Sequence, residues 1–425
     1  MARPGARPPG AAPGAERAAP IQVEVTGLAA GGDGIGRMPD GRIVFCEGAL
    51  PRERALVQVT EQHRDYARAS VVEIVEPSPA RVRPPCPEIA RGCGGCTWLH
   101  VDPSLQASFK AEIVADALAR IGHLPDVEVA PPPPGRTAVP ARGYRTGVRL
   151  AVDADGRPAY RVRRGHDLVP VQSCLVAHPL LADLATSARF PGAGEVLLRV
   201  GAATGERLAA PDRAARGATV PADVRMAAAG RPPPAVHEDV AGRRWRVSAG
   251  SFFQSGPAAA AGLVEAVTQA AGADRPQGDG LVVDLYAGVG VLGGSLAAGS
   301  RLVSVESSPT AVGDAVVNLA DLGGRVIHGE VLRACRSGDV VARGRNRPDL
   351  VLADPARSGL GPSVSAAVAA LGAPVLVLVS CDPASLGRDA RLLEGHGYHL
   401  ERVEVLDLFP QTFHVEAVSR FVRTP

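Results

Sequence analysis

The sequence predicts an α/β protein in which a mostly parallel, doubly wound sheet follows two β-rich segments. Three observations lead to this fold class. From about residue 280, apolar strands, glycine-bearing loops and helical stretches alternate, as they do in parallel sheets with helical crossovers. Between residues 21 and 77, short alternating runs are separated by glycine and proline turns, which predicts a small antiparallel barrel. Residues 144–198 form a further β-rich stretch in between.

Composition sets the first limits on function. The chain has 425 residues, of which 46% are hydrophobic, so it is long enough for two or three domains with substantial cores. Its formal net charge is only +2, and any nucleic-acid binding must therefore come from local patches. No apolar run reaches the 18 residues that a membrane span needs. Residues 1–20 lack the apolar region of a signal peptide and are predicted to be a disordered tail, so we expect a cytoplasmic location.

The predicted barrel contains a glycine-rich segment that invites comparison with a nucleotide-binding loop. Gly31–Gly36 does not fit the G-x-G-x-x-G pattern and opens no helix, so we interpret it as hairpin geometry. The strands expected around it are Ile21–Thr26, Arg42–Phe45, Ala55–Thr60 and Ala69–Val75.

Three cysteines follow the barrel with the spacing C-x6-C-x2-C. They are Cys86, Cys93 and Cys96, and Cys174 is a plausible fourth thiolate. In a reducing compartment, clustered cysteines indicate a metal site more often than disulfides. Four thiolates suit an iron-sulfur cluster or a structural zinc ion, and the spacing leaves both open. The remaining pair, Cys46 and Cys335, is expected to be core or surface thiols.

An amphipathic helix is expected over residues 103–121, followed by a proline-rich linker at 130–134. The next β-rich stretch carries several arginines, and arginines at alternate positions of a strand share one face. They predict either a basic strip for RNA or a solvated surface. The arginines are Arg145, Arg149, Arg157, Arg161, Arg163 and Arg164. Residues 203–234 show little periodicity and yield no assignment.

In the last third of the chain, chemically active side chains follow the ends of predicted strands. A glycine loop follows the strand at 281–286, and Glu306, Asp354 and Cys381 each follow a later strand. The carboxyl ends of parallel strands meet at one edge of a sheet, which is where open α/β folds place their ligands. We therefore expect these residues to lie together.

The glycine loop and the acid after the next strand indicate a ligand with a ribose. Gly288 and Gly290 let a ligand approach the backbone, and Glu306 can accept hydrogen bonds from ribose hydroxyls, with Asp284 on the first strand. Because this loop is shorter than the dinucleotide fingerprint, S-adenosylmethionine, which has no phosphate, is the better match. The alternative is a set of ordinary tight turns.

Cys381 ends an apolar strand and precedes a predicted helix. A helix N-terminus favours a thiolate, so this cysteine is a candidate nucleophile, although a buried structural thiol is the default for such a position. Glu416 is expected on a late strand, where a carboxylate close to a thiolate would serve as a base. Without such a partner it would be only an exposed acid.

Five motifs, taken in order, resemble the signatures of S-adenosylmethionine-dependent RNA uracil-5-methyltransferases. The resemblance extends from about residue 21 to residue 425, and the barrel resembles the TRAM domain, an RNA-binding module related to OB-type barrels. The motifs are Ser251-Phe-Phe-Gln254, Asp284-Leu-Tyr-Ala-Gly-Val-Gly290, Asp354-Pro-Ala-Arg-Ser-Gly359, Ser380-Cys-Asp-Pro-Ala384 and His414-Val-Glu416.

The resemblance implies a role for each matching residue. Cys381 would be the nucleophile and Glu416 the base. The contacts to S-adenosylmethionine would come from Gln254, Tyr286, Gly288, Gly290, Glu306, Glu330 and Asp354, and the ligands of a [4Fe-4S] cluster would be Cys86, Cys93, Cys96 and Cys174. The chain departs from the family pattern at Val291, Ala356 and Asp382, and its first cysteine gap is one residue longer than usual.

The family implies 5-methyluridine formation in structured RNA. We expect ribosomal RNA, because the simplest transfer-RNA enzymes lack the barrel and the cluster, with transfer RNA as the alternative. A non-catalytic RNA-binding iron-sulfur protein is a further alternative. DNA cytosine methyltransferases place their cysteine in a Pro-Cys dipeptide, which is absent around Cys381. The expected protein is a monomer with four parts: a tail (1–20), a TRAM barrel (21–80), a β-rich central domain with the metal cluster (81–250) and a Rossmann-like class I methyltransferase domain (251–425).

Overall fold

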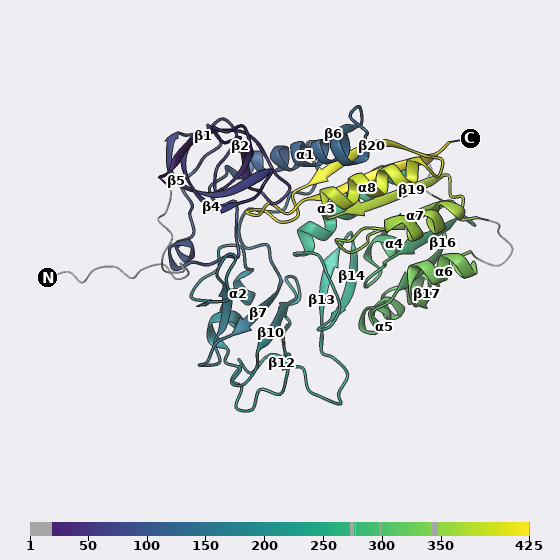
Figure 1. The fold of residues 1–425 in the computed structure, drawn as a ribbon. Coiled ribbons are helices and arrows are strands. Elements are labelled where there is room, and N and C mark those ends of the chain that lie inside the picture. Colours follow the sequence, from purple (N-terminus) through teal and green to yellow (C-terminus); the bar gives the residue numbers. More distant parts are fainter. Residues whose placement is uncertain (1–18, 273–275, 277, 298, 342–346, 425) are drawn as a thin grey trace. The chain divides into compact units, whose positions relative to one another are not determined.

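The computed structural model describes residues 19–272, 276, 278–297, 299–341 and 347–424 (Figure 1). The tail predicted for residues 1–20 lies, up to residue 18, outside this range. Contacts divide the chain into two compact units. The first consists of Asp33–Pro79 together with the residues up to Ala29, and the second of Ala30–Gly32 and Ala80–Pro425. Each unit is described by itself below.

The first unit is a closed five-stranded barrel, which confirms the predicted barrel but not its purely antiparallel pairing, because β3 and β5 run parallel to each other. Its strands run in the order β1-β2-β3-β5-β4. Alternate residues point inward, and side chains such as Val23, Val44 and Val57 are at most 1% exposed. Cys46 is also fully buried, which makes it a core thiol. The strands are β1 (Ile21–Leu28), β2 (Gly34–Arg37), β3 (Ile43–Glu47), β4 (Arg54–Gln62) and β5 (Tyr66–Glu76).

The glycine-rich segment of the barrel is a hairpin, and its second arm is β2. A Cβ atom on Gly36 would lie 2.3 Å from a methyl group of Val23 and 2.7 Å from the carbonyl oxygen of Glu24. Glycine is therefore required by close packing of β1 on β2, which agrees with the interpretation as hairpin geometry.

The second unit begins with the cysteine segment and a six-stranded sheet of order β12-β11-β10-β7-β8-β9. Leu181 and Leu184 on α2 are fully buried under this sheet. Residues 203–234, which the sequence left unassigned, supply β11 and β12. The elements are η1 (Pro87–Arg91), β7 (Gly147–Val152), β8 (Pro158–Arg161), β9 (Leu168–Pro170), α2 (Pro179–Ser187), β10 (Glu195–Val200), β11 (Arg207–Pro211), β12 (Val224–Met226), and the separate hairpin β13 (Ala235–Val240) and β14 (Arg243–Ser248).

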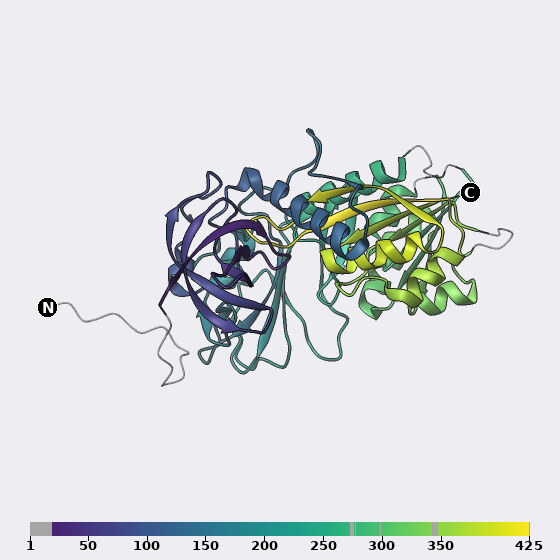
Figure 2. The same cartoon turned by 45° about the horizontal axis from the view of Figure 1, so that its top comes forward.

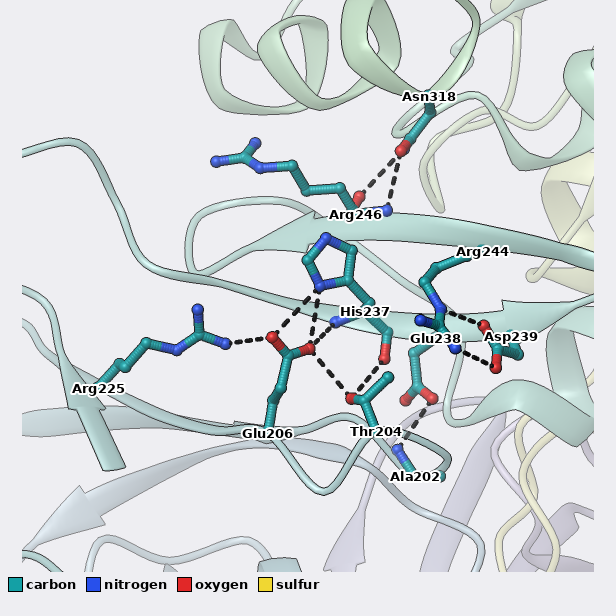
Figure 3. Close-up of polar contacts among 10 residues, drawn as sticks. All are labelled: Ala202, Thr204, Glu206, Arg225, His237, Glu238, Asp239, Arg244, Arg246 and Asn318. Carbon is teal, nitrogen blue, oxygen red and sulfur yellow. Dashed lines mark hydrogen bonds and ion pairs between the residues drawn. The ribbon is translucent and has the colours of Figure 1, made fainter. Parts of the chain in front are cut away.

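Polar contacts join the β13–β14 hairpin to both of its neighbours (Figure 3). On one side, Glu206 accepts hydrogen bonds from the backbone N–H of His237 at 2.7 Å and from Arg225 at 2.6 Å. On the other side, the Asn318 amide accepts from the backbone N–H of Arg246 at 2.8 Å and donates to its carbonyl at 3.0 Å. The hairpin is thus fixed between Glu206 on one side and Asn318 on the other.

The rest of the second unit is an eight-stranded sheet of order β17-β16-β15-β18-β19-β21-β20-β6. All neighbours in it are parallel except β21, which runs antiparallel to β19 and β20. Both faces carry buried apolar side chains, as a doubly wound sheet requires. The strands are β6 (Glu128–Ala130), β15 (Leu281–Leu285), β16 (Arg301–Glu306), β17 (Arg325–His328), β18 (Leu350–Ala353), β19 (Val375–Ser380), β20 (Tyr398–Leu406) and β21 (Glu416–Arg423).

Helices cover the sheet on both faces. They are α3 (Pro257–Ala271), α4 (Val291–Leu296), α5 (Pro309–Asn318), α6 (Val331–Ser337), α7 (Gly361–Ala370) and α8 (Pro383–Glu394), with the short helix η5 (Ala320–Leu322). Among the described residues, no helix combines the length and apolar character that crossing a bilayer requires.

An early part of the chain completes the sheet (Figures 1 and 2). The helix expected over residues 103–121 is present as η2 (Pro103–Leu105), α1 (Gln106–Ala117) and η3 (Leu118–Gly122). It leads into β6, whose Glu128 and Val129 pair with Arg402 and Val403 of β20. The division predicted at residue 250 stays a prediction; β6, which precedes it, is an edge strand of the eight-stranded sheet, and α1 packs on β6 and β20.

Candidate active site

The predicted strand-end residues do lie together. In the sheet, Ala353 at the end of β18 is paired with Leu285 of β15 and with Leu378 of β19. Asp354 and Cys381 each follow directly on their strands. Ser380 pairs with Ala417 of β21, so Glu416, at the first position of that strand, is brought beside Cys381. A thiol and two carboxyl groups therefore meet at one edge of the sheet.

Both carboxyl groups of this edge hold their protons more tightly than usual. Glu416 is 4% exposed, and burial, followed by the neighbouring Asp354, raises its pKa well above the usual value. Burial alone raises the pKa of Asp354 to about 7. Arg357 acts in the opposite direction on Glu416. Two adjacent buried carboxyl groups avoid ionising together, which makes each a stronger proton acceptor once ionised.

The environment of Cys381 disfavours its thiolate, contrary to the sequence-based expectation. Burial first, and then Glu416 and Asp354, raise the pKa of the thiol to about 11, while Arg357 lowers it. The helix N-terminus does not reverse this, because Asp382 is the N-cap of α8 and its carboxylate accepts the Ser385 backbone N–H at 2.8 Å. The dipole of the helix is thus compensated by a capping carboxylate.

The glycine loop after β15 is organised by two acids. Glu306 accepts hydrogen bonds from the backbone N–H of Gly288 at 2.8 Å and of Ser308 at 2.7 Å. Asp284 accepts from the backbone N–H of Gly293 at 2.9 Å. Gly288 has a φ of +56°, and a Cβ built on it would meet nothing within 4 Å. The loop therefore presents its backbone to open space beside Glu306.

Two buried acceptors near this loop have no hydrogen-bond partner among the described residues: one carboxylate oxygen of Asp284 and the amide oxygen of Gln254. Burial raises the pKa of Asp284 to about 7. Phe253, next to Gln254, packs on the cluster that contains Val289 of the loop. Unpaired buried acceptors are costly, and a ligand that offers hydroxyl or amino groups would satisfy them.

Tyr286 directly follows β15 and leads into the glycine loop. Tyr286 has a φ of +62°, a strained value for an aromatic residue. Its pKa is raised to about 12 by burial, with Cys335 and Glu330 as further causes, which indicates that Glu330 lies near its ring. Glu330 itself is exposed and precedes α6. The donor set fits a nucleoside-containing ligand, because it combines open backbone, carboxylates and an aromatic ring.

Two residues of the site, Arg357 and His414, were not predicted, although both stand inside the quoted motifs. A guanidinium nitrogen of Arg357 lies 3.3 Å from Nδ1 of His414. Because arginine offers only donors, Nδ1 accepts and the ring proton resides on Nε2. Burial, followed by Arg357, lowers the pKa of His414 to about 4, so the imidazole is neutral. The sequence did contain a signal for Arg357, namely its position in the motif Asp354-Pro-Ala-Arg357 directly after a strand end.

The four predicted metal ligands line one cavity, which we call the cysteine pocket. Cys86, Cys93, Cys96 and Cys174 surround it together with other residues, among them Arg145 and Tyr160. The Tyr160 hydroxyl lies 3.3 Å from the sulfur of Cys174. Burial, with added repulsion from the other three cysteines, raises the pKa of Cys96 to about 12. Within the described ranges, no group of three or more His, Cys, Asp or Glu side chains is arranged to hold a metal ion.

The predicted basic strip is not continuous. Arg157 forms ion pairs with Asp153 and Asp155, both at 2.8 Å, and Arg161 lies 3.4 Å from Glu195. Arg145 lines the cysteine pocket instead of the surface of the strand. These pairings favour the solvated-surface alternative for Arg157 and Arg161.

Comparisons with known proteins agree with the fold. Residues 18–72 match the TRAM domain. The chain is 35% identical to an "uncharacterized RNA methyltransferase" of Streptomyces coelicolor over 94% of its own length and 92% of the relative's, and 33% identical to one of Gloeobacter violaceus over 95% and 96%. A crystal structure of Pyrococcus abyssi tRNA (uracil-54, C5)-methyltransferase in complex with S-adenosyl-L-homocysteine superimposes with a TM-score of 0.69, covering 94% of this chain and 99% of that one at 22% identity. That similarity shows a shared fold.

Proposed function

Since the chain belongs to the family of RNA methyltransferases formed by these relatives, we propose that it methylates C5 of a uridine in structured RNA, with S-adenosylmethionine as the methyl donor. The observation that carries this proposal is the placement of Cys381 beside Glu416, at the strand edge next to Asp354. A thiol next to a basic carboxylate is what uracil chemistry at C5 requires.

The reaction needs both groups because uracil C5 is a weak nucleophile. Cys381 loses its proton and adds to C6, and the electron pair of the C5–C6 bond moves onto the O4 enolate. C5 then takes the methyl group of the donor, whose methyl–sulfur bond breaks, and the electron pair of that bond stays on the sulfur of the departing thioether. The C5 proton passes to Glu416, and the C6–sulfur bond breaks to restore the aromatic ring and the free cysteine. The target base has to leave its stack to reach Cys381, which costs least in a loop.

The residues proposed to hold S-adenosylmethionine surround the glycine loop, and the bound cofactor supplies an electrophilic methyl group. Glu306 is placed to accept from ribose hydroxyls while it keeps Gly288 in position. The unpaired amide oxygen of Gln254 supports its role as an acceptor. The complete set is Gln254, Tyr286, Gly288, Gly290, Glu306, Glu330 and Asp354. Asp354, which also adjoins Cys381, is placed to steady the polar edge of the uracil.

Two RNA substrates come into question. The first candidate is ribosomal RNA, because the family members that this chain resembles in having both a TRAM barrel and four clustered cysteines are those that act on ribosomal RNA. Transfer RNA is the second candidate: a protein described as a tRNA methyltransferase covers 94% of this chain, so the overall architecture does not separate the two substrates. Mapping 5-methyluridine in both RNA classes, from cells with and without the gene, decides between them.

The mechanism predicts different outcomes for its two reacting residues. Cys381→Ala should abolish methylation and every covalent adduct, because no enolate forms without addition at C6. Glu416→Gln should block proton removal, so methylated RNA should stay attached to Cys381. Denaturing gels with labelled RNA separate free from attached RNA.

A 5-fluorouridine substrate supplies the control, because fluorine cannot leave as a cation. It should trap the wild-type protein as an adduct and leave Cys381→Ala unmodified. If Cys381→Ala still methylates RNA, or still forms the adduct, the nucleophile lies elsewhere and the proposed mechanism is wrong.

For the cysteine pocket we propose a [4Fe-4S] cluster, which four thiolates around one cavity would hold. When bound, the cluster would supply a rigid four-point crosslink between the segment at Cys86–Cys96 and Cys174. Air-free purification should yield iron and sulfide with absorbance near about 400 nm. If the protein instead contains one zinc ion per chain and lacks that absorbance, the pocket is a structural zinc site and the proposed cluster is wrong.

A further inference from the structure

The loop between β20 and β21, residues 407–415, leads directly into Glu416 and carries His414. Its middle is buried, since Gln411 is 3% exposed and Thr412 5%. Gln411 also has a φ of +69°, a backbone conformation that side chains other than glycine rarely adopt. A strained residue persists where surrounding contacts hold it in place.

Those contacts come from the segment that follows the last cysteine of the Cys86–Cys96 group. The carbonyl oxygen of Gln411 accepts two hydrogen bonds, from the backbone N–H of Thr97 at 3.0 Å and of Trp98 at 2.9 Å. The Thr97 hydroxyl lies 3.3 Å from the backbone N–H of Phe413 and accepts from it. Three bonds thus tie the loop to residues that directly follow Cys96.

Gln106, the first residue of α1, forms further hydrogen bonds to the same part of the loop. Its side chain is fully buried. Its amide oxygen accepts the backbone N–H of Gln411 at 2.7 Å, and its amide nitrogen lies 3.3 Å from the side-chain oxygen of Gln411. The same nitrogen lies 3.3 Å from the carbonyl of Trp98 and 3.2 Å from that of Val101. We call this pair of amides, with the bonds from Thr97 and Trp98, the Gln106–Gln411 clamp.

The start of the loop is held by Lys110, the single lysine of the chain. Its ammonium group is fully buried, lies 2.5 Å from Asp407 and donates to the carbonyl of Phe409 at 3.2 Å. The Tyr144 hydroxyl donates to the carbonyl of Pro410 at 3.0 Å. Five residues of the loop are therefore bonded to residues between Thr97 and Tyr144; they are Asp407, Phe409, Pro410, Gln411 and Phe413.

The two reacting groups depend on this loop to different degrees. Cys381 is fixed between β19 and α8, which belong to the core of the sheet. Glu416 is the first residue of β21, and the chain that reaches it is the clamped loop. A change in the loop would displace the carboxylate relative to the thiol, and displacements of about 1 Å cost roughly a hundredfold in rate.

We propose that Gln106 is a positioning residue for proton removal: the Gln106–Gln411 clamp sets the place of Glu416 and couples it to the end of the cysteine segment. The proposal rests on the proposed function. On this proposal the clamp matters for removal of the C5 proton by Glu416, which comes after methyl transfer. The addition of Cys381 to C6 does not depend on the clamp.

The test separates the two halves of the reaction. In Gln106→Leu, methylation of an ordinary uridine RNA should slow by roughly 10- to 100-fold. Methylated RNA attached to Cys381 should accumulate during turnover, because its release waits for Glu416. With 5-fluorouridine RNA, adduct formation should keep the wild-type rate, since that adduct forms before the step that Glu416 performs.

Two further variants keep the test independent of folding. Thr97→Val has nearly the same shape and removes only the bond to Phe413, so it should show a smaller accumulation of the same adduct. Tyr398→Phe removes another buried polar group, a hydroxyl that donates to the carbonyl of Ala373 at 2.7 Å, and is the matched control for lost stability. It should lower the melting temperature without accumulating attached RNA.

Each result bears on one claim. A wild-type protein that forms no fluorouridine adduct overturns the proposed function, whatever the variants do. If the wild type forms it and both clamp variants turn over at the wild-type rate, the positioning role is wrong. The same holds if adduct formation with fluorouridine RNA falls as much as turnover, because the loss is then one of general structure.

Discussion

Arg357 is the positive charge that acts on both reacting side chains. It lowers the pKa of Cys381 and of Glu416, against the effects of burial and of Asp354. Its guanidinium also lies 3.3 Å from His414, a neutral ring on the loop before Glu416. The free protein therefore keeps a largely protonated thiol, and this arginine limits how far its reactivity is suppressed.

Alkylation of Cys381 should follow this balance of charges. With a pKa of about 11, roughly a thousandth of the thiol is ionised at pH 8, so iodoacetamide should react slowly and its rate should rise until about pH 11. Arg357→Ala should raise the pKa and slow the reaction at pH 8. Glu416→Gln removes a nearby carboxylate and should accelerate it. Peptide mapping by mass spectrometry follows Cys381 separately from the other cysteines.

Equal alkylation rates in the three proteins would show that these charges do not reach the thiol. A midpoint below about pH 9 in the wild type would instead restore the expectation that the start of α8 activates Cys381.

The glycine loop is the element that depends most on a single side chain. Glu306 accepts the backbone N–H groups of Gly288 and Ser308, which belong to different turns. The sequence predicts this residue as a ribose acceptor and therefore as a residue of binding alone. The structure adds a second task, because removing the carboxylate leaves two backbone donors without their partner.

Glu306→Ala should weaken S-adenosylmethionine binding by about 1 to 3 kcal/mol, the range for hydrogen bonds to a charged group. It should also lower the free energy of unfolding by about 1 kcal/mol or more, since two donors lose their acceptor. Titration calorimetry and thermal denaturation measure the two effects. Glu330→Ala, at an exposed position, is the control and should leave stability nearly unchanged. Unchanged affinity in Glu306→Ala would place the cofactor elsewhere.

Elements with a strong local pattern were predicted well. The helix over residues 103–121 and the four strands before Tyr286, Glu306, Asp354 and Cys381 are present close to their expected positions. Short elements were missed, because three or four residues carry too little periodicity: β2, β6 and β12 are examples. The start of α2 did leave a signal, since Pro179 at the first helical position follows the capping residue His178.

From the residues alone, only those members of the site that follow the ends of parallel strands could be predicted. That rule places Cys381, Asp354 and Glu306, since parallel strands end at one edge. The clamp was beyond its reach, because Gln106 and Gln411 are 305 residues apart and neither stands at the end of a strand. The buried ion pair of Lys110 with Asp407 could not be predicted for the same reason.

At the scale of the molecule, the barrel and the second unit each have their own core. Chain 80–425 should therefore fold without the barrel and bind S-adenosylmethionine with unchanged affinity. Its melting temperature should fall slightly, because the Trp98 indole N–H loses the Gly32 carbonyl that it contacts at 3.2 Å. If the barrel contacts RNA, the truncated chain should bind RNA at least about tenfold more weakly, which corresponds to the loss of one stacked base.

Calorimetry and RNA binding at two salt concentrations check this expectation. RNA affinity equal to that of the full chain would exclude the barrel from substrate binding, and loss of cofactor affinity would show that the two units do not fold independently.

The ion pair between Lys110 and Asp407 can form only late in the synthesis of the chain. The two residues are 297 positions apart, so at a translation speed of about 5 to 20 residues per second the lysine waits roughly 15 to 60 seconds for its partner. For most of that interval α1 and β6 have been synthesised, but neither β20 nor the loop after it exists. The face of α1 that is buried in the folded protein and one edge of the sheet are then exposed on the nascent chain. A chaperone that shields this segment, or a pause that delays it, would act on the assembly of the active site before Glu416 has been made.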